Sequence, residues 1–222
     1  MSATRTDRYS SFAELARIER RGEDYDIVAI PGAHSSVVII APHGGRIEHG
    51  TSELARCIAG EEYGFYAFEG HKPRGQNRAL HITSHRFDEP QGLALVQAAQ
   101  VVVAIHGCIG TGQVCIGGLD TVLANTLAVT LAAAGLPVLG EGHRYPARHP
   151  LNICNRGVRG RGAQLEFTAD LREPGYRVPI ARAVRYAIGR HLAALSECAQ
   201  AVDPASSWPV VGTPHRRTSS GD

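Results

Sequence analysis

Two histidines and a glutamate lie where a sheet protein could use them as metal ligands. His43 and Glu48 stand on a glycine-rich turn directly after the apolar run Val37 to Ile40. His106 is the first polar residue after the apolar run 101–105. Two imidazoles and a carboxylate are the ligand set of a catalytic zinc that keeps its fourth position for water. The three residues predict an open zinc site suited to hydrolysis, in which the metal acidifies water and polarises a carbonyl.

A fourth residue, Glu166, is the candidate general base. It stands in the strand-like segment Gly162 to Thr168, among Ala, Leu and Phe side chains. A carboxylate is costly to bury there without a partner or a raised pKa. A separate carboxylate is also what amide hydrolysis needs, to take a proton from water and pass it to the leaving amine.

Each residue also has a structural interpretation. A single histidine after a strand is usually a hydrogen-bonded core or surface residue. Glu48 could be a charge favoured by the dipole at a helix N-terminus, and Glu166 could be half of a buried ion pair. Their joint position beside glycines at strand ends favours the metal hypothesis.

These side chains need a scaffold that brings strand ends together. Apolar and β-branched runs predict strands at 26–30, 36–40, 63–68, 79–84, 101–105, 114–116, 137–139 and 162–168. Capping and stop signals predict helices from Ser11 to near Gly22 and at 52–59, 90–99, 120–134 and 178–195. The alternation predicts a layered α/β sheet with helices on both faces, in which function gathers at the carboxyl ends of strands.

Length and charge limit the possible classes of protein. A chain of 222 residues suits one domain. Its 23 Lys and Arg against 21 Asp and Glu give a net charge of +2, which argues against a nucleic-acid or anionic-membrane partner. From about Gln200 the chain is rich in Pro, Ser and Gly, so we predict a single domain over 1–199 and a disordered tail over 200–222.

The compartment follows from what the sequence lacks. No apolar signal region is present at the start, and the longest apolar stretch, 127–139, is too short and too broken to cross a bilayer. The five cysteines have no CxxC spacing, which predicts buried thiols and no disulfide framework. We therefore expect a cytoplasmic protein, released by lysis if its substrate lies outside the cell, and a monomer.

Two further groups of residues carry weaker signals. Gly107 to Gly112 hints at a phosphate-binding loop, but its spacing is not GxGxxG and a strand follows it. Cys108 as a nucleophile would need a base, and His106 is poorly placed for that role if it binds metal. His81 and His85, at the end of a predicted strand, either line the same cleft or face water.

Six motifs occur in order through roughly residues 7 to 195. They are Ala41-Pro-His-Gly-Gly-Arg-Ile-Glu-His-Gly-Thr-Ser-Glu53, Phe68-Glu-Gly70, Leu80-His-Ile-Thr-Ser84, Phe87-Asp-Glu-Pro90, Asn152-Ile-Cys-Asn-Arg156 and Gly162-Ala-Gln-Leu-Glu166. Together they resemble the poly-γ-glutamate hydrolase family of phages and bacteria. The resemblance implies a zinc-carboxypeptidase-like fold, a three-layer α/β sandwich with a mixed, mostly parallel sheet.

The resemblance also implies roles for individual residues. It places one zinc ion on His43, Glu48 and His106, and makes Glu166 the general base and acid. His43 and Glu48 are five residues apart, whereas the familiar carboxypeptidase pair is three apart, so the turn between them must differ.

A substrate of γ-linked glutamates asks for arginines that hold carboxylates. Asn155 and Arg156 match a family motif, and such a pair holds a substrate carboxylate in carboxypeptidase-like sites. Arg86 and Arg78 are secondary candidates. The basic run Arg156 to Arg161 is either a solvated loop or a further anion-binding element. Because the net charge is only +2, any attraction must be local to the cleft.

Three functions stay open at this point. The first is a zinc-dependent hydrolase that cleaves γ-glutamyl amide bonds of poly-γ-glutamate. The second is the same catalytic centre acting on another amide, such as a cell-wall γ-glutamyl link or an N-acyl amino acid. The third is a binding domain without catalysis, which would hydrolyse no amide at all.

Overall fold

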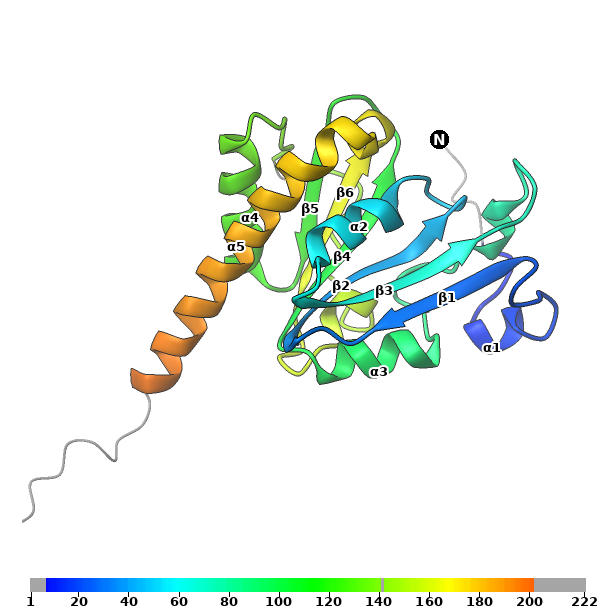
Figure 1. Ribbon diagram of the computed structural model, residues 1–222, viewed down its shortest axis with the longest axis horizontal. Helices are drawn as coiled ribbons and strands as arrows, with labels where there is room; N and C mark the ends of the chain where they lie inside the picture. The colour runs from blue at the N-terminus through cyan, green and yellow to red at the C-terminus, as the bar shows by residue number, and fades with distance from the viewer. Residues whose placement is uncertain (1–6, 141, 202–222) are drawn as a thin grey trace, which may run out of the picture.

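The computed structural model describes residues 7–140 and 142–201, and within them the chain folds around a six-stranded sheet (Figure 1). The strands are β1 (Tyr25–Ile30), β2 (His34–Gly45), β3 (Tyr63–Gly70), β4 (Val101–Cys108), β5 (Val114–Gly118) and β6 (Ala163–Thr168). Their order across the sheet is β1-β3-β2-β4-β6-β5.

The sheet is mixed and mostly parallel, as predicted. Strands β3, β2, β4 and β6 run parallel, and β1 and β5 join the two edges antiparallel. The central strands consist of consecutive apolar residues because helices cover both of their faces. Parallel strands end at the same edge, so β2, β4 and β6 present their last residues together.

Helices form the two outer layers. They are α1 (Phe12–Leu15), α2 (Thr51–Ala59), α3 (Pro90–Ala98), α4 (Thr121–Ala133) and α5 (Pro174–Ala201), with short 3-10 turns η1 (Asn77–Leu80), η2 (Ile153–Asn155) and η3 (Ala169–Arg172). Helices α2, α4 and α5 cover one face, where Leu54, Leu127 and Ile188 join one apolar core. Helices α1 and α3 lie on the other face, where Leu15 and Val96 join a second core. The predicted three-layer arrangement is confirmed.

The predicted strand at 79–84 is wrong. The 3-10 turn η1 ends at Leu80, and the chain beyond it is irregular. Its backbone groups bond to side chains that are distant in sequence: the N–H of Thr83 donates to the Asp7 carboxylate, and the carbonyl of Ile82 accepts from His43. With these groups already bonded, the segment has no ladder to join.

Two other elements differ from their predicted extent. Helix α1 ends at Leu15 and not near Gly22, because Glu19 turns inward, where its buried carboxylate bonds to the Tyr9 hydroxyl and pairs with Lys72. The predicted strand 137–139 forms a single bridge between residues 114 and 138.

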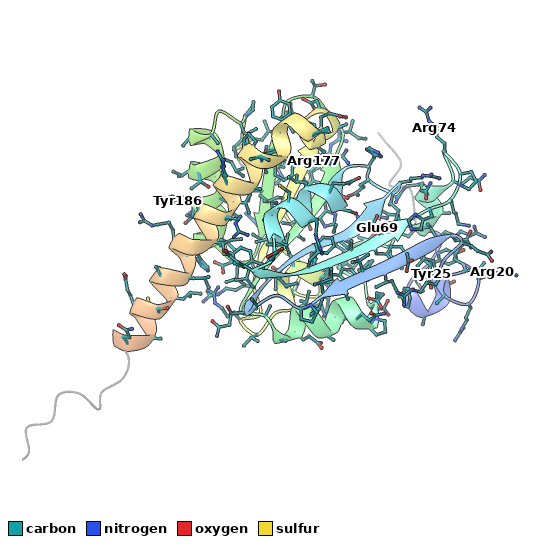
Figure 2. All side chains as sticks on the ribbon, in the orientation of Figure 1. Arg20, Tyr25, Glu69, Arg74, Arg177 and Tyr186 are labelled. Carbon is teal, nitrogen blue, oxygen red and sulfur yellow. The ribbon has the colours of Figure 1, made fainter. Side chains whose placement is uncertain are left out.

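Helix α5 is longer than predicted at both ends. It begins at Pro174, where the fixed φ of proline suits a first helical turn. It continues to Ala201, so the first two residues of the tail predicted over 200–222 are helical, and the rest of that tail lies outside the described residues. The outer side of the helix faces solvent: Figure 2 shows Tyr186 projecting from it, and that residue is 60% exposed.

Candidate metal centre and catalytic cleft

Parallel strands bring the predicted ligands and the predicted base together. His43 lies near the carboxyl end of β2, where the ladder to β3 is irregular, and Glu48 follows on the turn to α2. His106 of β4 pairs in register with Glu166 of β6. Neighbours in register point to the same face of a sheet. All four side chains line one cleft.

His43, Glu48 and His106 form a compact group of potential metal ligands, with donor atoms all within 4.8 Å of one another. Nδ1 of His43 lies 3.0 Å from Oε1 of Glu48 and 3.1 Å from Nδ1 of His106. Nδ1 of His106 lies 3.5 Å from Oε2 of Glu48. Two ligand atoms, each ~2.1 Å from a tetrahedral zinc, would be ~3.4 Å apart. The observed spacing fits such an ion.

The outward-facing ring atoms of both histidines contact the irregular segment that follows η1. Nε2 of His43 donates to the carbonyl of Ile82 at 2.8 Å, and Nε2 of His106 lies 3.5 Å from the Ser84 hydroxyl. A carbonyl only accepts, so the proton of a neutral His43 is on Nε2 and the lone pair of Nδ1 faces the centre of the group. Nδ1 of both rings and the carboxylate of Glu48 face one point, an arrangement that a cation satisfies.

Glu48 is held by the backbone of β4. The N–H of Gly107 donates to Oε2 of Glu48 at 2.8 Å. A Cβ at position 107 would lie 2.6 Å from Nη1 of Arg172, so any other residue there would have to displace the guanidinium. Arg172 is buried, and its Nη1 donates to the carbonyl of His49. A guanidinium is therefore packed directly behind the candidate ligands.

The pKa directions agree with a ligand role for Glu48. Burial raises its pKa, but the charge of His43 and the hydrogen bonds from both histidines lower it further, so the pKa lies well below the usual range. Burial lowers the pKa of His43, and Glu48 more than offsets this, leaving it raised. Burial also lowers the pKa of His106. An ionised Glu48 and a neutral His106 are the states that metal ligation requires, whereas the raised pKa of His43 favours a ring proton that metal binding would release.

Glu166 has the environment of a proton carrier. It is 4% exposed, and the side-chain amide of Gln164 donates to its Oε1 at 2.7 Å. Asn152 donates in turn to the oxygen of that amide at 3.0 Å. Burial, and after it the charge of Glu48, raises the pKa of Glu166 well above the usual range. No ion pair of Glu166 is found in the part of the chain that the structure describes, so the ion-pair interpretation gains no support.

His81 packs directly on the candidate ligand His43. The ring centroids are 4.0 Å apart and the ring planes are inclined by 30°. Nδ1 of His81 lies 2.7 Å from Oδ1 of Asp7. Burial, and after it the charge of His43, lowers the pKa of His81 to about 4, so the ring is neutral at neutral pH. Both His81 and His85 line the cleft.

The cleft has a volume of about 490 Å³, and one of its walls is a loop that the sequence analysis missed. This rim loop, residues 144–149, contributes Arg144, Tyr145, Arg148 and His149. Both arginines are exposed. The loop has no regular period, and the density of basic and aromatic residues between 143 and 149 is the one signal that could have indicated it.

The residues predicted to hold substrate carboxylates lie elsewhere. Asn155, Arg156, Arg78 and Arg86 are absent from the residues that line the cleft. The buried Asn155 side chain binds four backbone groups, accepting from residues 119 and 162 and donating to residues 147 and 149. Arg156 is half-buried, and Arg78 and Arg86 are exposed. A substrate role for these four stays a prediction.

The two weaker sequence signals have structural explanations. β4 extends to Cys108 and β5 begins at Val114, so the glycine-rich segment between them joins two strands and opens no phosphate-binding helix. Burial raises the pKa of Cys108 to about 12. A thiol that stays protonated is a poor nucleophile.

Residues 9–177 match a family model described as poly-gamma-glutamate hydrolase. The chain belongs to the poly-gamma-glutamate hydrolase family. Two Bacillus subtilis (strain 168) proteins support this assignment, and each is 39% identical over 170 residues, or 75% of this chain. The match covers 71% of the UPF0714 protein YmaC and 66% of the UPF0714 protein YndL, so the chain spans just under two thirds of YndL.

Two solved structures share the fold. A bacteriophage poly-gamma-glutamate hydrolase superposes with a TM-score of 0.81 and 28% identity, over 85% of this chain and 100% of that one. The zinc-free apo form of YndL superposes with a TM-score of 0.76 and 32% identity, over 83% of this chain and 98% of that one. The predicted family and the prediction of a hydrolase are confirmed.

In the described part of the chain, no helix combines the length and the apolar character that crossing a membrane requires.

Proposed function

We propose that this chain is a zinc-dependent hydrolase that cleaves the γ-glutamyl amide bonds of poly-γ-glutamate. The observation that carries the proposal is the convergence of His43, Glu48 and His106 in one cleft, with Glu166 beside them. Family membership supports the substrate class. The existence of a form of YndL described as zinc-free supports zinc as the metal.

One zinc ion would be held by Nδ1 of His43, Nδ1 of His106 and the carboxylate of Glu48. When bound, zinc supplies a Lewis acid that polarises the scissile carbonyl and lowers the pKa of a water molecule. The residues around the ligands fix their orientation: the carbonyl of Ile82 holds one ring, and the N–H of Gly107 holds the carboxylate. Such outer contacts keep the ligand geometry ready for the ion.

Glu166 would move the proton. Its carboxylate takes a proton from the attacking water while the new C–O bond forms, and it gives that proton to the amide nitrogen when the C–N bond breaks. The products are a carboxyl group and an amine. Because Gln164 binds Oε1, the other oxygen, Oε2, is left for the proton. Burial raises the pKa of Glu166, which suits a carboxyl group that must hold a proton between the two steps.

The cleft suits an anionic substrate. Glu48 and Glu166 are the only carboxylates among its lining residues, and both have roles in the chemistry. Arg144 and Arg148 contribute exposed guanidinium groups on the rim loop. Guanidinium groups pair with carboxylates, so the rim loop supports a polymer that carries one carboxylate per residue.

Metal analysis and polymer digestion test the proposal together. We expect the purified full-length chain to bind stoichiometric zinc and to shorten purified poly-γ-glutamate on a gel. Zinc-loaded protein that leaves the polymer intact but hydrolyses another γ-glutamyl or N-acyl amide would overturn the substrate and keep the chemistry. Hydrolysis of no amide would favour a binding domain.

A further inference from the structure

Asp7 is a buried carboxylate that fixes the orientation of one ring in the cleft. Its side chain is 2% exposed. One oxygen, Oδ2, accepts from both the N–H and the hydroxyl of Thr83. The other oxygen, Oδ1, lies 2.7 Å from Nδ1 of His81. Oδ1 also lies 3.7 Å from Nη2 of the exposed Arg78. The carboxylate is therefore held by contacts to both of its oxygens.

This contact decides which nitrogen of His81 carries the ring proton. A carboxylate only accepts hydrogen bonds, so the proton is on Nδ1, between the ring and Asp7. A neutral imidazole carries one ring proton, so Nε2 presents a bare lone pair. No described residue bonds to Nε2, and the side chain keeps 18% of its surface exposed in the cleft. The pair thus places a hydrogen-bond acceptor beside the metal ligands.

The location of this acceptor limits what it can bind. His81 packs on His43 of β2, whereas Glu166 enters the cleft from β6, beyond β4. Along a chain of γ-linked glutamates, carboxylates and carbonyls are acceptors, and the amide N–H is the donor that every link offers. A bare lone pair in the cleft matches that N–H.

We propose that Asp7 and His81 orient the substrate, with Nε2 of His81 accepting a hydrogen bond from the N–H of the scissile amide. The inference rests on the proposed function and adds a specificity contact to it. When the carbonyl carbon becomes tetrahedral, the amide nitrogen becomes pyramidal and its lone pair points away from its substituents. Holding the N–H on the β2 side turns that lone pair toward the β6 side, where Glu166 delivers the proton. His81 touches the substrate, and Asp7 is a positioning residue that acts through it.

Paired amide and ester substrates test the contact. The probes are an end-blocked γ-glutamyl dimer and its ester analogue, in which oxygen replaces the scissile N–H. His81→Phe keeps a ring against His43 and removes Nε2. We expect kcat/KM of this variant to fall about 10- to 100-fold on the amide and to change less than about twofold on the ester, which has no N–H to lose. Equal losses on both substrates, or no loss on the amide, would overturn the proposal. His71→Phe, at an exposed histidine, is the matched control.

Asp7→Asn tests the tautomer without removing a ring. The Asn oxygen can keep the two donors of Thr83, and its NH2 group then faces Nδ1 of His81, which must become the acceptor. The ring proton moves to Nε2, and an acceptor becomes a donor. We expect nitrogen-15 shifts of the His81 ring, assigned by their loss in His81→Phe, to report a proton on Nδ1 in the native chain and on Nε2 in the variant. The variant should lose amide selectivity as His81→Phe does, while Asp26→Asn, at a half-exposed carboxylate on β1 that pairs with Arg21, should lose none.

The two proposals fail in different ways. Wild-type protein that cleaves neither probe contradicts the proposed function, whereas the ring spectrum still reports the tautomer. Binding of the amide and the ester to zinc-loaded protein, measured by calorimetry, then decides the contact. Tighter binding of the amide, lost in His81→Phe, supports it, and equal binding of the two overturns it. A native spectrum with the proton on Nε2 overturns it in every case.

Discussion

The two walls of the cleft are built in different ways. On one wall, His43 and His106 are each 2% exposed, stand on neighbouring parallel strands and have their outer ring atoms held by the chain. On the other wall, Arg144 and Arg148 are exposed on an irregular loop. Strand register fixes atoms to within the tolerance that a metal ion demands, whereas a loop can change its side chains without disturbing the sheet. We therefore expect the strand wall to determine the chemistry and the rim loop to determine substrate affinity.

Removing a ligand is the most severe way to break the strand wall. For His106→Ala we expect the loss of bound zinc after dialysis and a fall in polymer hydrolysis to background, because two remaining ligands hold the ion poorly. Ser84→Ala removes only the outer contact of the same ring, and we expect it to weaken zinc binding about 10-fold. Stoichiometric zinc on His106→Ala would contradict the assignment of the ligands.

Glu166→Gln separates chemistry from metal binding on the same wall. The substitution keeps the shape of the side chain and removes its capacity to carry a proton. We expect folded, zinc-loaded protein with kcat lowered about 10²- to 10⁴-fold. Glu173→Gln, at an exposed position just beyond η3, is the matched control and should turn over normally. Normal turnover in Glu166→Gln would remove this residue from the mechanism.

The packing behind the ligands is tested by a single methyl group. In Gly107→Ala the new Cβ would meet the guanidinium of Arg172, so we expect a loss of about 1–3 kcal/mol in the free energy of unfolding, measured by denaturant titration. Zinc affinity should fall as well, because the N–H of this residue holds Glu48.

Gly189→Ala should change the free energy of unfolding in the opposite direction. That glycine lies in α5 with nothing within 4 Å of the added atom, so we expect a gain of about 0.5–1 kcal/mol. Equal effects of the two substitutions would show that the close packing at position 107 has no energetic consequence.

Substitutions in the rim loop should have the smallest effect, and the effect should be on KM and not on kcat. For the double substitution Arg144→Gln and Arg148→Gln we expect KM for the polymer to rise about fivefold with kcat unchanged, because exposed ion pairs contribute little each. The effect should shrink in high salt. Arg190→Gln is the control, because Arg190 lies roughly 24 Å along α5 from Pro174, the first residue of that helix. A fall in kcat with constant KM would contradict the division between the walls.

The strand wall was predictable because its signals are local. Apolar runs indicate the central strands, and the first polar residue after each run falls at their carboxyl ends, as His106 does. The choice of candidate ligands follows from that position and from residue type alone. The family resemblance added the substrate class, which no spacing could indicate.

The features that the sequence did not predict depend on contacts between distant parts of the chain. The segment after Leu80 has the composition of a strand, but its backbone bonds to His43, 39 residues before Ile82, and to Asp7, 76 residues before Thr83. The rim loop is irregular and reaches the cleft only in the folded chain, so no periodic pattern in the sequence indicates its position. Asn155 matches a family motif, yet its side chain binds the backbone of three loops, so a motif match did not reveal its contacts.

The peptide group that joins Ile82 to Thr83 connects the charge of Asp7 to the candidate metal ligand His43. Its N–H donates to the Asp7 carboxylate at 2.7 Å, and its carbonyl accepts from Nε2 of His43 at 2.8 Å. An anion on the N–H side of an amide shifts electron density toward the amide oxygen, and linked hydrogen bonds polarise one another. The ring of His43 thereby becomes a stronger electron-pair donor at Nδ1. Through the resonance of a single amide, Asp7, which precedes the 9–177 family match, would adjust the Lewis acidity of a zinc ion bound by His43.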